Sequence, residues 1–232
     1  YTLENYGKVP GELWVNDGDG NFFLDDGTLI PDMPTFEHPR KIITTDLNGD
    51  LVPDIVIADH GFDAAPFPGA RLVAILSNID GSHTTEIIEE GGYHHGVSAG
   101  DFDSDGDVDL FSVAKDHGGI FINDGLGNFT SANLLTEFNN KSKFYNTVSF
   151  DVDNDGKDDI IVLPDEYENP RILYQGSDGF KDYKELILPS PDGYGTINDA
   201  GFMDLNSDGI KDIVINATGS RSSSFYKGNI FY

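Results

Sequence analysis

The chain of 232 residues contains no cysteine, and this absence excludes a disulfide framework, zinc sites built from thiolates and catalysis by a cysteine nucleophile. Basic residues are scarce, because 14 Lys and Arg stand against 41 Asp and Glu, for a formal net charge of −27. A surface this acidic repels phosphate backbones and anionic lipids, so we expect no nucleic-acid partner. No apolar run approaches the ~20 residues of a membrane span, so we expect no membrane insertion.

The residues that are present favour an all-β fold. Hydrophobic residues make up 38% of the chain and aromatic residues 12%, which is enough for a packed core. The 27 glycines are well above the usual share of about 7%, and together with frequent Asp and Asn they indicate many turns. No segment has the pattern of a helix. Residues 1–9 lack the features of a signal peptide, so we expect any such peptide to have been removed.

Four acidic blocks recur along the chain, at intervals of about 50 residues. Each block follows a short alternating segment and runs directly into an apolar, β-branched string that is typical of a buried strand. An Asn/Gly-rich turn comes later in the unit, as expected for a hairpin. The unit is therefore four short strands, A to D, which is the pattern of a β-propeller blade. The blocks are residues 46–54, 101–109, 151–159 and 204–212, and the apolar strings are residues 55–58, 110–113, 160–163 and 213–216.

The acidic blocks have the spacing of a metal site. Side-chain oxygens at positions 1, 3, 5 and 9, with the backbone carbonyl of position 7, can converge on one hard cation. Calcium accepts six to eight oxygens in loose geometry, so we expect up to four Ca²⁺ ions. The predicted ligands are Asp46, Asn48, Asp50, Val52, Asp54, Asp101, Asp103, Asp105, Asp107, Asp109, Asp151, Asp153, Asp155, Lys157, Asp159, Asp204, Asn206, Asp208, Ile210 and Asp212.

An EF-hand is excluded, because its twelfth position needs a bidentate Glu and here that position falls inside the apolar string in every block. The first block departs from the others, with Gly49 at position 4 and Leu51 where the others have glycine at position 6. It keeps all four side-chain ligands. We therefore expect it to bind calcium, but more weakly than the others.

These blocks, with hairpins such as Asn123-Asp-Gly-Leu-Gly-Asn-Phe129, resemble the FG-GAP/VCBS repeats of integrin α-subunits and secreted bacterial proteins. The stretch 58–69 is similar to the bacterial branch of that family. The resemblance implies an all-β propeller of four-stranded antiparallel blades with calcium in the A–B loops, usually with seven blades. It leaves function open, because the family includes adhesion proteins, lectins and polysaccharide lyases.

The blade count differs from that expectation. We expect one domain over residues 1–232, with blades at about 1–36 (partial), 37–90, 93–140, 144–190 and 195–232 (partial). Seven blades of ~50 residues would need about 350 residues, so the sequence indicates a small or incomplete ring. Either further blades of a larger propeller complete it, or terminal strands share one blade and hide both sheet edges.

Strand A begins, and strand B ends, at the face opposite the acidic loops. Polar and aromatic residues gather at those positions, and blade symmetry would bring them around one mouth. They could contact a ligand or hold a second metal, or they could be the polar turns that a loop-rich face collects. The candidates for ligand binding are His60, His94, His95, His117, Tyr145 and Glu166, and the candidates for catalysis are His95, His117 and Tyr93.

Two classes of function follow from this interpretation. The first is a calcium-stabilised extracellular or cell-surface module that binds a glycan or a protein through the mouth. The second is a polysaccharide lyase, in which His or Tyr removes the proton next to a uronate carboxylate and Arg171 is a candidate carboxylate clamp. No Ser-His-Asp motif, P-loop or dinucleotide fingerprint is present. The excess of negative charge disfavours the lyase, so the binding module is the preferred hypothesis.

Overall fold

The computed structural model describes residues 7–62, 65, 67–114, 117–132, 144–164, 169–186, 196–217 and 229–231. These residues form strands and turns and contain no helix. Within the same ranges, therefore, no helical segment has the length and apolar character needed to cross a membrane. The predicted all-β fold is confirmed.

Three four-stranded antiparallel sheets follow one another along the chain, and each has its strands in sequence order. A fourth sheet has three described strands. This arrangement confirms the predicted four-stranded units, with the acidic block always between the first two strands. The sheets are β5 (Pro39–Thr45), β6 (Asp54–Asp59), β7 (Ala70–Ser77) and β8 (His83–Gly92); β9 (His94–Gly100), β10 (Asp109–Ala114), β11 (His117–Asn123) and β12 (Phe129–Ala132); β13 (Phe144–Phe150), β14 (Asp159–Pro164), β15 (Arg171–Gly176) and β16 (Gly179–Glu185); and β17 (Ile197–Met203), β18 (Asp212–Ala217) and β19 (Asn229–Phe231).

The N-terminal segment contributes two small sheets. Strand β1 (Val9–Pro10) pairs with β4 (Thr35–Phe36), and β2 (Trp14–Asn16) forms a hairpin with β3 (Phe22–Leu24). In the β2–β3 turn, the Asp17 carboxylate accepts hydrogen bonds from the backbone of Asp19 and Asn21. Asp124 does the same for the β11–β12 turn, where it accepts from Leu126 and Asn128. The β2–β3 turn therefore has the same hydrogen-bond pattern as the turn between the third and fourth strands of the second sheet.

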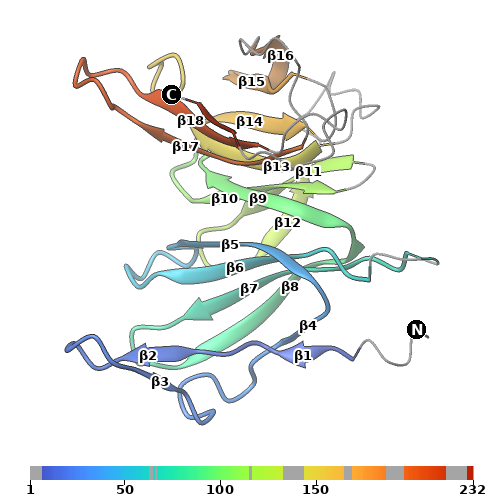
Figure 1. Ribbon diagram of the computed structural model, residues 1–232, viewed down its shortest axis with the longest axis vertical. Coiled ribbons are helices and arrows are strands. Elements are labelled where there is room, and N and C mark those ends of the chain that lie inside the picture. Colours follow the sequence, from blue (N-terminus) through green and yellow to red (C-terminus); the bar gives the residue numbers. More distant parts are fainter. Residues whose placement is uncertain are drawn as a thin grey trace.

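The sheets stack face to face along the long axis of the molecule (Figure 1). The second strands of the second and third sheets, β10 and β14, are buried on both faces. This explains why their sequences are continuous apolar strings rather than alternating ones. In β14, Ile160 and Val162 pack toward the second sheet, whereas Ile161 and Leu163 pack toward the fourth. Period-two alternation along one strand thus builds two separate cores.

Candidate metal loops and the opposite mouth

Each acidic loop is folded around its own carboxylates. In the loop 101–109, the Asp101 carboxylate accepts hydrogen bonds from the backbone N–H groups of Asp105 and Gly106, both at 3.1 Å. Asp103 also accepts from Asp105 N, at 3.2 Å, and Asp105 accepts from Asp107 N, at 2.9 Å. The loops 151–159 and 204–212 repeat all four bonds. The side chains at positions 1, 3 and 5 are therefore drawn to the inside of each loop.

This turn needs left-handed backbone at positions 4 and 6. In the second loop Ser104 has φ 65° and Gly106 has φ 97°, and the first loop has the same two conformations at Gly49 (73°) and Leu51 (67°). The unusual first loop has thus exchanged its glycine between the two positions and kept the same path. Leu is a worse residue for left-handed backbone than Ser or Asn, because its side chain makes no local hydrogen bond there.

The ninth-position aspartate has a role that its spacing does not reveal. Asp109 is fully buried, and its two oxygens accept hydrogen bonds from Phe102 N in the loop (2.8 Å) and Asn123 N in the third strand (2.9 Å). Asp54 and Asp159 make the equivalent pairs of bonds in their sheets. This residue therefore ties the A–B loop to strand C.

The same burial disfavours the charged form of these acids. It raises the pKa of Asp109 to about 6, although the backbone donors of Asn123 and Phe102 act in the opposite direction. Burial also raises the pKa of Asp54 and of Asp159. At Asp103, burial and then the neighbouring charge of Asp105 raise the pKa. A bound cation would relieve this cost, because it stabilises the carboxylates.

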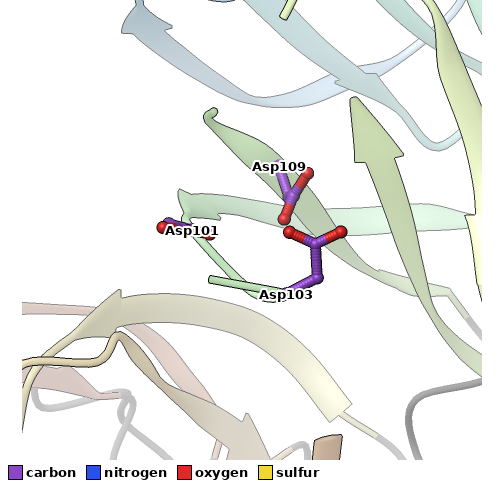
Figure 2. Close-up of side chains that lie close together, drawn as sticks. All are labelled: Asp101, Asp103 and Asp109. Atoms are coloured by element: carbon purple, nitrogen blue, oxygen red, sulfur yellow. The ribbon is translucent and has the colours of Figure 1, made fainter. Parts of the chain in front are cut away.

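Two of the loops bring three acids together in a way that could hold a metal ion. Ligand oxygens of Asp101, Asp103 and Asp109 all lie within 4.8 Å of one another, and the same holds for the equivalent acids at positions 151, 153 and 159. Figure 2 shows the Asp103 and Asp109 carboxylates pointing toward each other. The other two loops carry Asn at position 3, so an amide oxygen replaces the third carboxylate there.

Adjacent loops also contact one another. The Asn123 side chain donates to Val108 O in its own sheet and to Leu47 O in the loop of the sheet before it. Gln175 donates to Ser104 Oγ in the same manner, one sheet further along. Because these amide side chains bridge neighbouring loops, an ion in one loop would also stabilise the packing between sheets.

The opposite end of the sheets carries a feature that repeats four times. The first strand of each sheet has a β-bulge near its start, and the bulged residues are Arg40, His95, Tyr145 and Asn198. A bulge inserts an unpaired residue and re-aims its side chain. All four side chains thus leave their sheets at corresponding positions, at the end away from the acidic loops.

Several of the predicted mouth residues come together here. The His60 ring packs edge-on against Tyr93 (4.2 Å between ring centroids) and His95 (4.3 Å). His95 in turn contacts Tyr145, at 5.0 Å. The Tyr145 hydroxyl lies 3.3 Å from Arg40 Nη1, and the Arg40 guanidinium lies 6.0 Å from the Tyr145 ring centroid. Residues from three sheets thus form one aromatic and basic cluster, the mouth cluster.

The members of the mouth cluster differ in their access to solvent. His60 and Tyr93 are buried, at 2% and 8% exposure, and the Tyr93 hydroxyl donates to Phe62 O at 2.7 Å. Arg40, His95 and Tyr145 are partly exposed. The buried rings therefore support the cluster from inside the protein, and the other three side chains are the ones that solvent reaches.

Other predicted residues lie elsewhere. His94 is fully buried, and it contacts Ser112 Oγ at 2.9 Å and Glu89 at 3.5 Å. Asp59, at the end of β6, has a structural role, since it accepts hydrogen bonds from Glu37 N, His38 N and Gly61 N.

The side chain of His117 and the whole of Glu166 lie outside the described residues. The predicted carboxylate clamp, Arg171, lies over the Phe144 ring. The arginine that contacts Tyr145 is Arg40.

The polar contacts between the residues that follow the bulges were not predicted from the sequence. Lys41 from the first sheet contacts Asn146 Oδ1 (3.0 Å) in the third sheet and Asp199 Oδ1 (3.1 Å) in the fourth. The equivalent residue of the second sheet is Gly96, where a Cβ would lie only 2.5 Å from Asn146 Oδ1. Glycine is required there, because Asn146 occupies the space of a side chain. The only sequence signal was the position, two residues into each first strand.

A model of the FG-GAP-like repeat matches residues 101–162 and 151–215, which contain the second, third and fourth acidic loops. This match confirms the resemblance that the acidic blocks predicted. No curated protein matches the chain.

Among solved structures, a chain from the crystal structure of BBS1N in complex with ARL6DN is similar, with 14% identity and a TM-score of 0.46. An Agrocybe aegerita lectin that recognises non-reducing terminal N-acetylglucosamine is similar with 15% identity and a TM-score of 0.46. The matches cover 84% and 97% of this chain. They span 55% of the first structure's chain and 75% of the second's.

Proposed function

We propose that this chain, whose residues 101–162 and 151–215 match the FG-GAP-like repeat, is a calcium-stabilised extracellular binding module. It holds a glycan or protein partner at the mouth, opposite the calcium loops. The observation that carries this proposal is the repeated β-bulge, which presents Arg40, His95 and Tyr145 together at one end of three sheets. Binding requires only such a presentation, whereas catalysis would also require a positioned base and a clamp for the reacting group.

Calcium is the ion that suits the acidic loops. Oxygens within 4.8 Å of one another need only small side-chain movements to lie at the 2.3–2.6 Å that is the range of Ca–O distances. The donors are all oxygens, and the seventh residue of each loop can add a backbone carbonyl. Extracellular modules bind calcium with Kd values of about 10⁻⁴–10⁻³ M. Calcium sites of this affinity suit a protein that lies outside the cell, so we propose an extracellular location.

Removal of one loop carboxylate tests the ion sites. We expect Asp103→Ala to weaken calcium binding to the second loop by roughly tenfold or more, because one charged ligand is lost while the other acids still repel each other. Isothermal titration with calcium measures the change. Asp19→Ala is the matched control, because Asp19 lies in the β2–β3 turn, outside the acidic loops. Equal losses in both variants would refute the assignment of the loops.

The mouth cluster can contact sugar rings and polar groups. Partly exposed His95 and Tyr145 offer ring faces and hydrogen-bonding groups, and Arg40 adds a cation that contrasts with the net charge of the chain. His60, which itself packs against Tyr93, packs against His95, so the His95 ring is oriented before a partner arrives. Preorganisation of this kind lowers the entropic cost of binding.

Mutation of the partly exposed members tests the mouth. On an array of neutral and acidic glycans and immobilised extracellular proteins, we expect the parent to bind a defined subset. His95→Ala and Tyr145→Ala should each weaken that binding by roughly tenfold, as for an aromatic contact in a binding site. Their calcium-dependent melting should change little, because the loops lie at the other end of the strands. Thr130→Ala, an exposed residue of β12, is the control. Parent-like binding by both mouth variants would exclude the mouth as the site.

A polysaccharide lyase is the second candidate, and the contact between Arg40 and Tyr145 is the observation that favours it. In a lyase step the arginine would neutralise the substrate carboxylate, while the tyrosine, as phenolate, would take the proton next to it and return that proton to the leaving glycosidic oxygen. His95 lies against the same tyrosine. Ultraviolet absorbance of unsaturated uronate products, measured on acidic polysaccharides, separates the lyase from a binding module.

A further inference from the structure

A cavity of about 430 Å³ lies far from the mouth, between the segment 28–32 and the start of β8. Its volume is within the range of about 300–1,000 Å³ that is typical of small-molecule sites. Strand β8 is the edge strand of the first sheet, and the N-terminal segment covers it there. Neither the acidic loops nor the mouth cluster contributes a residue to this cavity.

Both walls of the cavity are held in place by hydrogen bonds. Asp25 accepts from Gly27 N, Leu29 N and Thr28 Oγ1, which fixes the first wall. Ile30 then anchors that wall, because its buried side chain packs with the core of the first sheet. Asn78 donates to Ser82 O and Oγ across the β7–β8 turn, which fixes the second wall. The cavity is therefore formed before any ligand arrives.

The lining has a definite chemical character. Four of the ten lining residues carry hydroxyls (Thr28, Ser82, Thr84 and Thr85), and they lie beside an apolar patch, Leu29 to Pro31, and one carboxylate, that of Asp32. At the same wall, Nδ1 of His83 is enclosed and has no hydrogen-bond partner among the described residues. Hydroxyls can both donate and accept, so they match a ligand that carries hydroxyls of its own. The apolar patch matches a face of C–H groups.

From this lining we infer that the cavity is a binding site for one neutral sugar unit, separate from the mouth. A sugar ring has the required combination of hydroxyls at its edge and C–H groups on its face. Asp32 is the only acid in the lining, and it can accept from a sugar hydroxyl but would repel a carboxylate. The site therefore selects neutral sugars over uronates.

Chemical-shift mapping on the calcium-loaded chain tests this site. Glucose, galactose and N-acetylglucosamine are titrated to high millimolar concentration, with glucuronate as the charged comparison. We expect at least one neutral sugar to shift the backbone amides of residues 28–32 and 81–85, and glucuronate to bind several-fold more weakly. Thr84→Val should weaken the binding about threefold to tenfold, as for one lost hydrogen bond. Thr84→Trp should abolish it by filling the cavity.

Controls separate the cavity from the mouth and from general damage. Thr130→Trp places the same bulk on an exposed threonine of β12, the edge strand of the next sheet, and should leave the shifts intact. His95→Ala removes a mouth residue and should also leave them intact, so failure of the mouth proposal does not affect this one. The proposal is overturned if no sugar shifts these segments, if Thr84→Trp binds like the parent, or if the shifts appear at the mouth alone.

Discussion

Excess chelator is expected to lower the melting temperature by roughly 10–20 °C. An ion present at 100 times its Kd adds about 2.7 kcal/mol per site, and each kcal/mol moves the melting temperature of a chain of this size by about 2–4 °C. The figure assumes the two loops in which three acids converge within 4.8 Å. Without the ion, these carboxylates repel one another at the turn that joins strands A and B.

Differential scanning calorimetry with calcium, with EGTA and after calcium is restored measures this effect. Magnesium at the same concentration is the matched control and should restore little of the lost stability, because it needs shorter bonds and a strict octahedron. If EGTA leaves the melting temperature unchanged, the acidic loops are solvated turns rather than ion sites.

Asp109→Asn is expected to be the most damaging single change in a loop, but only when calcium is present. In the calcium form the variant loses a ligand, and its amide nitrogen cannot accept the bond from Phe102 N or Asn123 N. A lost bond of this kind leaves a buried donor unsatisfied, so we expect a loss of about 3 kcal/mol or more. In EGTA the loss should be smaller. A shift of the Asp109 pKa from 3.8 to about 6 disfavours its charged form by about 3 kcal/mol at neutral pH, and Asn has no charge to bury.

The free energy of unfolding of the calcium-free protein should depend on pH. Because the folded-state pKa of Asp109 is raised, the folded protein without calcium takes up a proton between pH 6 and pH 3.8, and the unfolded chain does not. The free energy of unfolding in EGTA should therefore rise as the pH falls from 7 to 5, and less so in Asp109→Asn. Asp80→Asn is the control, since hydrogen bonds donated by Ser82 lower the pKa of that turn acid. Equal pH slopes in the parent and in Asp109→Asn would contradict the account of Asp109 as a buried, desolvated acid.

The sequence by itself determined what depends on near neighbours in the chain. The nine-residue acidic blocks, the apolar strings after them and the Asn-Asp-Gly turns each lie within a few residues, so spacing alone predicted loops, buried strands and hairpins. The first loop illustrates this well. Its exchanged glycine at position 49 was visible in the sequence, and the loop keeps both left-handed positions.

Only the tertiary structure decided the features that join distant segments. The sequence assigned Asp109 to a metal, but its bond to Asn123 N depends on the register between β10 and β11. Lys41 meets Asp199 because four bulged strands approach one another, and no local pattern encodes that approach. The burial of His60 and the cavity beside His83 follow likewise from the packing of separate segments. Side-chain access is a property of the packed sheets, so a list of polar residues at one end could not separate the buried members of the mouth cluster from the partly exposed ones.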